Sequence, residues 1–145
     1  AEIRHGDARI VLTKAHAYMN ESGPAIASLA RKQGVEPGRV IVVHDEIDLP
    51  FGALRVKFGG STAGHNGVRS VASSLRTPDF LRVRLGVGRP SGRKDAADWV
   101  LEDFAKREVA DVEALVEDGA DAALSLVSGG LALTQERFNR AGPRV

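Results

Sequence analysis

Residues 40–48 read Val-Ile-Val-Val-His-Asp-Glu-Ile-Asp, a β-branched run that passes directly into one imidazole and three carboxyl groups. A short apolar run bounded by polar residues is typical of a buried strand. Open α/β sheets carry their sites at the carboxyl ends of such strands. The stretch therefore predicts a buried, central strand with a polar cluster at its end.

Three other stretches have the pattern of strands. Ile10 to Leu12 form a second apolar run, for which we also predict a buried, central strand. Residues 54–58 and 81–88 alternate apolar with basic or glycine positions, which predicts strands with one apolar face and one basic or bare face.

Helical spacing fills the stretches between these strands. Apolar residues at i, i+3 and i+4 predict helices over 22–33 and 68–75, and a long amphipathic helix over 109–127. Gly129 and Gly130 should end the long helix before a short last segment near Phe138. Strands that alternate with helices predict one α/β domain over residues 1–145, a layered fold with a mixed, largely parallel sheet flanked by helices.

Composition limits the chemistry. The 145 residues contain no cysteine, which excludes disulfides, thiolate metal sites and thiol nucleophiles. No run of 18 apolar residues, export signal or lipidation signal is present, so we expect a cytoplasmic protein without a membrane partner.

The charges separate along the chain. Nine Lys or Arg face one acid, Asp79, between residues 52 and 94, whereas ten acids face two bases between residues 95 and 127. We expect a basic surface suited to a polyanion and an acidic surface, although both could be ordinary solvated faces.

The cluster at residues 44–48 has three possible roles. Asp45 could orient a histidine from elsewhere, as the acid of a Ser-His-Asp triad does. A divalent metal site is a weaker alternative, because the spacing matches no calcium-loop pattern. The cluster could also be only a polar loop before the turn at residues 49–52.

A glycine-rich stretch, Gly59–Gly67, leads into the predicted helix over 68–75. It has neither a P-loop ending nor a dinucleotide fingerprint. Its backbone N–H groups and the Asn66 amide could face a polar or anionic ligand, or Asn66 could be only an N-cap.

Several isolated residues carry weaker signals. Asn20 has a neutral amide that suits a polarising role in hydrolysis. Lys57 and Arg84, on polar strand faces, could bind phosphates or simply face solvent. We interpret His5 and His16 as surface residues.

Taken together, residues 18–23 (Tyr-Met-Asn-Glu-Ser-Gly), 44–52 (His-Asp-Glu-Ile-Asp-Leu-Pro-Phe-Gly), 64–67 (Gly-His-Asn-Gly) and 82–90 (Arg-Val-Arg-Leu-Gly-Val-Gly-Arg-Pro) resemble the successive signatures of bacterial peptidyl-tRNA hydrolases. The resemblance covers essentially the whole chain. It implies a monomeric esterase without metal or organic cofactor, which cleaves peptide from the 3′-terminal ribose of peptidyl-tRNA and so recycles tRNA from stalled or aborted translation.

The resemblance also implies roles for matching positions. Asp45 corresponds to the aspartate that orients the catalytic histidine, and Asn20 to an amide of the catalytic site that positions water. Tyr18, Asn20, His65 and Asn66 correspond to the substrate-binding site. Lys57 and Arg84 match the basic clamp that recognises the 5′-phosphate of tRNA, in agreement with the basic block.

One part of the family pattern has no match here. The family opens with a strand and a Gly-Asn-Pro-Gly turn, followed by the catalytic histidine and a helix. Arg4-His5 resembles the family's Arg-His pair only superficially, because it precedes the strand that leads to Asn20. We expect a domain that lacks its N-terminal strand and helix, and an activity that depends on that segment.

Two other functions fit parts of the sequence. A non-catalytic RNA-binding module on the same fold would use the basic block but leave Asp45, Asn20 and Asn66 without a purpose. A domain that binds a small molecule would leave the pairing of Lys57 with Arg84 unexplained.

Overall fold

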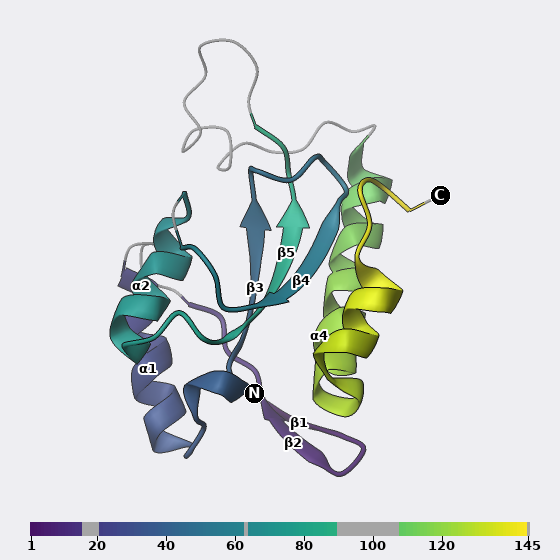
Figure 1. Ribbon diagram of the computed structural model, residues 1–145. Coiled ribbons are helices and arrows are strands. Elements are labelled where there is room, and N and C mark those ends of the chain that lie inside the picture. The colour runs from purple at the N-terminus through teal and green to yellow at the C-terminus, as the bar shows by residue number, and fades with distance from the viewer. Residues whose placement is uncertain (16–20, 63, 90–107, 145) are drawn as a thin grey trace. The chain divides into compact units, whose positions relative to one another are not determined.

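The computed structural model describes residues 1–15, 21–62, 64–89 and 108–144 (Figure 1). The chain divides into two compact units, Ala1–Val42 with Lys57–Arg82 and Val43–Val56 with Val83–Val145. The elements are, in order, β1 (Glu2–His5), β2 (Ala8–Val11), α1 (Ser22–Lys32), the 3-10 turn η2 (Pro37–Arg39), β3 (Ile41–Glu46), β4 (Leu54–Phe58), α2 (Asn66–Leu75), β5 (Leu81–Gly86) and α4 (Val109–Phe138). The α/β class is confirmed, and the single domain stays a prediction.

Three strands form one sheet in the order β3-β5-β4. β3 and β5 point the same way and β4 points the opposite way (Figure 1), so the sheet is mixed, as predicted, with one parallel and one antiparallel pairing. Among the described strands, β3 lies at an edge of this sheet and β5 in the middle, so the central position predicted for residues 40–43 is not found there. An apolar run alone does not distinguish these positions.

The first two strands form a separate antiparallel hairpin in which His5 pairs with Ala8. Gly6 adopts a φ of 60° in the two-residue turn between them, a value that glycine tolerates without strain. The prediction of a buried strand at residues 10–12 is therefore wrong: Leu12 is 48% exposed, and β2 pairs only with β1 among the described strands.

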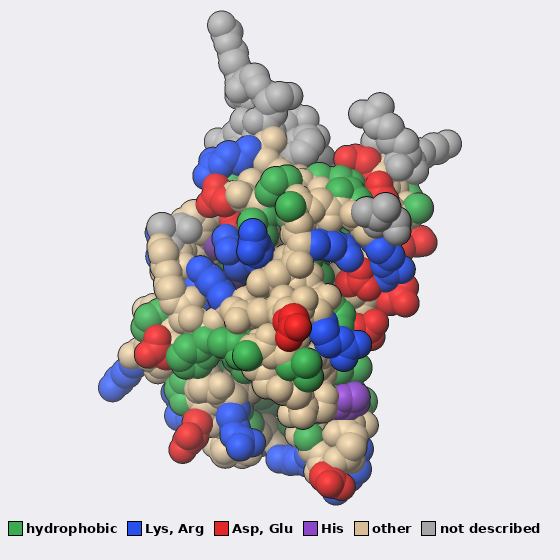
Figure 2. Space-filling view, turned by 45° about the vertical axis from the view of Figure 1, so that its right-hand side comes forward, with side chains coloured by type: hydrophobic (Ala, Val, Ile, Leu, Met, Phe, Trp, Pro, Cys, Tyr) green, Lys and Arg blue, Asp and Glu red, His purple; other side chains and the backbone are tan. Residues whose placement is uncertain are grey.

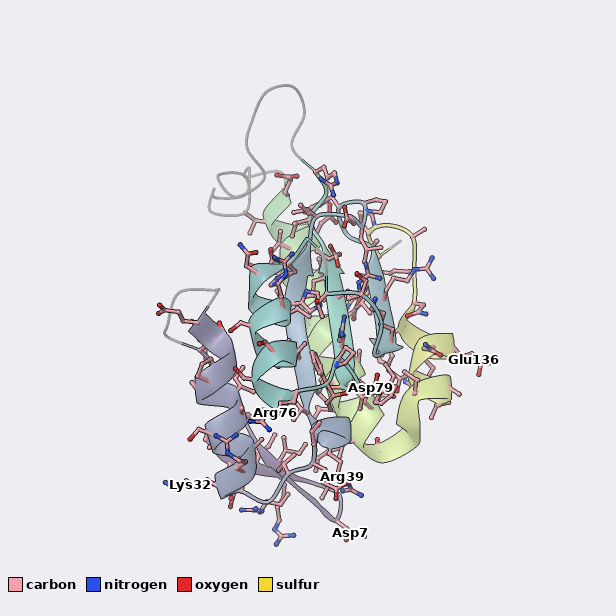
Figure 3. The ribbon with its side chains drawn as sticks, turned by 60° about the vertical axis from the view of Figure 1, so that its left-hand side comes forward. Asp7, Lys32, Arg39, Arg76, Asp79 and Glu136 are labelled. Carbon is pink, nitrogen blue, oxygen red and sulfur yellow. The ribbon has the colours of Figure 1, made fainter. Side chains whose placement is uncertain are left out.

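The first unit has a core between its two helices. Gly23 of α1 donates its N–H to Ser70 Oγ of α2 at 2.8 Å, and a Cβ at Gly23 would lie 1.9 Å from the Ser70 carbonyl oxygen. Glycine thus permits the close approach of the two helices. Gly34, with φ 67°, ends α1, and Arg76 follows the last turn of α2 (Figure 3). The core residues are Val68, Val71 and Phe80, flanked by Ile26, Val40, Val42, Ala72 and Leu75.

The second unit is built on α4. A Cβ at Gly119 of α4 would lie 2.9 Å from Leu85 of β5, so helix and strand are closely packed. Gly130, with φ 82° and ψ 179°, breaks the helix where the sequence predicted its end. Acidic side chains gather on the exposed surface of α4 (Figure 2), as the acidic block predicted; they include Glu113, Glu117 and Asp121. No helix among the described residues is long and apolar enough to cross a membrane.

Asp118 of α4 binds two arginines of the C-terminal segment. Its carboxylate accepts hydrogen bonds from Arg140 and Arg144, and Arg140 also donates to the Gly52 carbonyl at 3.1 Å. Arg140 and Leu54 exchange both backbone hydrogen bonds. The hydrogen bond from Arg144 is the largest of the effects that lower the pKa of Asp118 below its ordinary value of 3.8; Arg140 adds to it, and burial opposes it.

We expect Asp118→Asn to reduce the free energy of unfolding by about 1 kcal/mol at neutral pH, because this ion pair is partly exposed and screened. A folded-state pKa below 3.8 means that the stabilisation is present above this pH and is lost as the pH falls through the folded pKa. Urea unfolding at a series of pH values should show that the difference in free energy of unfolding between the unchanged protein and Asp118→Asn shrinks as the pH falls. Glu113→Gln on the same helix should leave stability unchanged, and an Asp118→Asn difference that stays constant down to low pH would argue against this account.

Candidate active site

The polar cluster predicted after residues 40–43 lies at the end of β3. Asp45 is half-buried, and His44 Nδ1 donates a hydrogen bond to the Asp45 backbone oxygen at 2.7 Å. Within the described ranges, no group of three or more His, Asp or Glu side chains is placed to hold a metal ion.

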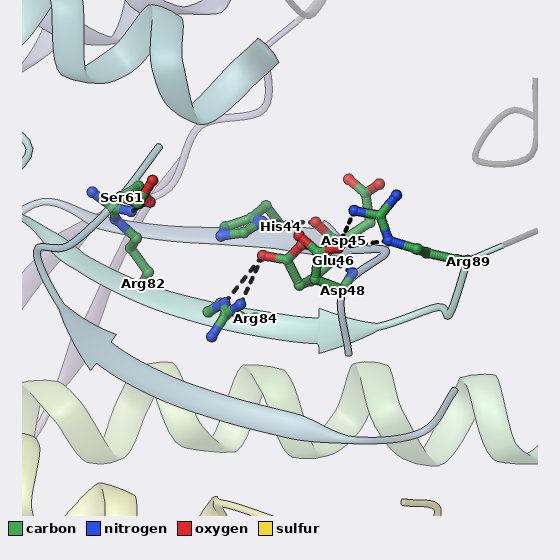
Figure 4. Close-up of polar contacts among 8 residues, drawn as sticks. All are labelled: His44, Asp45, Glu46, Asp48, Ser61, Arg82, Arg84 and Arg89. Carbon is green, nitrogen blue, oxygen red and sulfur yellow. Dashed lines mark hydrogen bonds and ion pairs between the residues drawn. The ribbon is translucent and has the colours of Figure 1, made fainter. Parts of the chain in front are cut away.

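Glu46 ties Arg84 to the end of β3. Arg84 donates from Nε at 3.1 Å and from Nη2 at 3.0 Å to Glu46 Oε1 (Figure 4). Glu46 Oε2 accepts the Asp48 backbone N–H at 3.2 Å, while the Asp48 carboxylate pairs with exposed Arg89. The Glu46 side chain is 11% exposed and that of Arg84 20%, so this is a largely buried ion pair with both carboxylate oxygens in use.

The glycine-rich loop is anchored by Arg82 of β5, which is only 1% exposed. Its guanidinium donates to the carbonyl oxygen of Ser61 at 2.8 Å (Figure 4). It also donates to the carbonyl oxygens of Gly60 at 3.2 Å and Pro78 at 2.9 Å. It also stacks on Phe80, with Cζ 4.6 Å from the ring centroid. Arg82 lies on the face of β5 that the sequence predicted to be basic, and the loop covers its side chain.

Arg82→Lys should destabilise the protein by about 2 kcal/mol, since an ammonium cannot reach three separate carbonyl oxygens with the geometry of a guanidinium fork. Thermal unfolding measures the loss of stability. Hydrogen exchange should show faster opening of the amides between Ser61 and His65. Arg55→Lys, at an exposed position of β4, is the control, and equal effects of the two substitutions would contradict an anchoring role.

His65 is the residue that caps α2. Its Nδ1 accepts the Val68 backbone N–H at 3.1 Å, an N-cap interaction that Ser, Thr, Asp or Asn usually provides. The alternative that Asn66 is only an N-cap is wrong, because Asn66 is the first helical residue and is exposed.

Lys57 lies near the end of β4, just before the same loop. A Cβ at Gly60 would be 3.0 Å from the Lys57 ammonium nitrogen, so the ammonium lies against the backbone there. Lys57, His65 and Asn66 thus belong to one compact unit, together with the loop that links them. Asp45 and Arg84 belong to the other unit, and the assembly of the two sets into one site stays a prediction.

Tyr18 and Asn20 lie outside the described residues, and so does His16. Two residues of the site were missed by sequence reasoning: Glu46 was counted only as a member of the cluster, and Arg82 only as a basic position. Strand alternation places both on polar faces, but only the register of β3 against β5 and the path of the loop reveal their partners.

Comparison with known proteins decides the family: the model of the peptidyl-tRNA hydrolase family matches residues 1–144. The chain belongs to this family. It is 54% identical over 140 residues to the peptidyl-tRNA hydrolase of Mycobacteroides abscessus, covering 97% of this chain and 71% of that relative. It is 47% identical over 136 residues to that of an Arthrobacter species, covering 94% of this chain and 70% of the relative.

Solved structures of peptidyl-tRNA hydrolases agree with this assignment. The crystal structure of an Arg119Gln mutant of the Acinetobacter baumannii peptidyl-tRNA hydrolase superposes with a TM-score of 0.87 at 25% identity, covering 99% of this chain and 72% of that one. A crystal structure of a peptidyl-tRNA hydrolase complex with N-propanol gives a TM-score of 0.86 at 26% identity, with the same coverage.

Proposed function

We propose that this chain carries most of the site of an enzyme that hydrolyses the ester between a peptide, or an N-blocked aminoacyl group, and the 3′-terminal ribose of tRNA. The main support for this proposed activity is the family match over residues 1–144, with 54% identity to a named peptidyl-tRNA hydrolase. The product is free tRNA recovered from stalled or aborted translation. We also propose that the protein acts in the cytoplasm as a monomer.

Asp45 orients the histidine that accepts a proton from the attacking water. A carboxylate that accepts the imidazole N–H selects the tautomer and stabilises the imidazolium that forms. The hydrogen bond from His44 to the Asp45 backbone supports this role, because it helps to hold the end of β3 in place. Neutral Asn20 stabilises the charge that develops on the ester oxygen without a change of protonation state.

Substrate recognition involves two further groups. Tyr18, Asn20, His65 and Asn66 bind the peptide and the 3′ end; the exposed position of Asn66 at the start of α2 suits a contact with a carbonyl group. Lys57 and Arg84 bind the 5′-phosphate of tRNA and supply part of the affinity.

The test is the release of labelled peptide from N-blocked aminoacyl-tRNA, measured for this chain and for a version extended upstream to its natural start. Cleavage by the extended protein supports the hydrolase. Binding of tRNA without cleavage by either version would replace it with a non-catalytic RNA-binding module.

A further inference from the structure

We propose that Glu46 is a positioning residue that holds the Arg84 guanidinium by one edge and so presents its other end to a tRNA phosphate. The inference rests on the proposed function, in which Arg84 binds the 5′-phosphate. It adds a residue for which the sequence provided no role.

Glu46 uses only one edge of the Arg84 guanidinium and leaves its other N–H groups available. Glu46 Oε1 occupies the Nε–Nη2 edge of Arg84, with contacts of 3.1 and 3.0 Å. A guanidinium has five N–H groups in a fixed planar fork. The Nη1 group and the second Nη2 hydrogen therefore remain, and among the residues that the structure describes Arg84 has no hydrogen-bond partner besides Glu46.

Glu46 is itself fixed from the other side. Its Oε2 accepts the Asp48 N–H at 3.2 Å, and its own backbone oxygen accepts the Val87 N–H at 3.0 Å, which joins β3 to the end of β5. The side chain cannot rotate away from Arg84 without breaking the hydrogen bond to Asp48. The carboxylate is thus a rigid support for the arginine.

A phosphate is not expected to displace this carboxylate. The Glu46 side chain is only 11% exposed, and a buried carboxylate that loses its partner is left with an uncompensated charge at a large cost in free energy. Arg84 keeps both Glu46 contacts and meets the phosphate with its remaining N–H groups. The Glu46 carboxylate offsets the positive charge of Arg84, but it also fixes the direction in which the remaining N–H groups of Arg84 point.

The experiment uses two forms of one tRNA, with a 5′-monophosphate and with a 5′-hydroxyl, and measures both dissociation constants by fluorescence anisotropy at fixed salt. The ratio of the two constants reports the 5′-phosphate contact alone. We expect roughly a tenfold ratio for the wild type, the value of one hydrogen bond between charged groups.

Glu46→Gln should reduce this ratio to about twofold, even if affinity for both RNAs rises through the loss of a negative charge. Asp48→Asn is the matched control: it removes one carboxylate two residues away but leaves the Asp48 backbone contact intact, and it should preserve the ratio. Preservation of the tenfold ratio in Glu46→Gln, or an increase of the ratio, would overturn the inference.

Arg84→Lys provides a test that leaves the buried carboxylate in place. Lysine keeps the charge but has no edge for Glu46 to hold, so the ratio should fall as in Glu46→Gln, and the double variant should fall no further. Equal and additive losses would indicate that the two residues act separately and would overturn the inference.

Arg84→Gln distinguishes the role of Arg84 in phosphate binding from the role of Glu46 in positioning Arg84. An unchanged ratio in this variant would remove Arg84 from the phosphate site, and with it part of the proposed function. If Arg84→Gln abolishes the difference in affinity between the two forms of tRNA and Glu46→Gln preserves it, only the role of Glu46 is overturned.

Discussion

Asp45→Asn is expected to lower kcat/KM for N-blocked aminoacyl-tRNA by about 10³ to 10⁴-fold in the upstream-extended protein, with a much smaller effect on KM. An amide in place of the carboxylate cannot stabilise an imidazolium, and it no longer selects the tautomer whose free nitrogen accepts a proton from water. The measurement is the rate of peptide release at several substrate concentrations.

The matched control for this prediction is Asp48→Asn, three residues further along the same segment and paired with exposed Arg89. It should change kcat/KM by less than threefold. A loss of under tenfold in Asp45→Asn would show that another group orients the histidine, and the assignment of Asp45 would be wrong.

Gly86→Ala should reduce the free energy of unfolding by about 3 kcal/mol, because the new methyl group has no space. It would lie 2.2 Å from the Pro50 carbonyl oxygen and 3.0 Å from the Leu49 Cβ. The Pro50 oxygen cannot move away freely, since it accepts the Ala53 N–H at 3.0 Å. The Gly86 backbone is tied down as well, donating to the Ala53 carbonyl at 2.8 Å.

Chemical denaturation measures this loss of stability, with Gly38→Ala as the matched control. A Cβ at Gly38 meets nothing within 4 Å, so the same change of residue type should alter stability by less than about 0.5 kcal/mol. Similar stabilities of the two variants would mean that the turn after β3 accommodates a side chain at Gly86.

Local periodicity predicted most of the helices and strands. The period-two segments became β4 and β5, the 3.6-period segments became α1, α2 and α4, and Gly130 interrupts α4 where its sequence suggested. The hairpin at residues 2–11 was missed because its only signal is the pair Gly6-Asp7 between two short runs, which the apolar run 10–12 outweighed.

The site was predictable as a set of motifs but not as a set of contacts. Asp45 and the glycine-rich loop stand out because polar residues and glycine follow apolar strands. The partner of Arg84 depends on which residues of β3 and β5 lie opposite each other, and that register is a property of the folded sheet. For the same reason, the sequence marks Arg82 only as a basic position, because the path of the loop that covers it is also a property of the folded chain.

Hydrolysis in water enriched in ¹⁸O tests the proposed chemistry most directly. The upstream-extended protein would be given N-blocked aminoacyl-tRNA, and the released acid and the tRNA would be analysed by mass spectrometry. Attack of water on the ester carbonyl predicts one ¹⁸O atom in the carboxylate of the released acid and none in the tRNA. Label in the 3′ ribose, or tRNA that is bound but remains acylated, would contradict ester hydrolysis by this site.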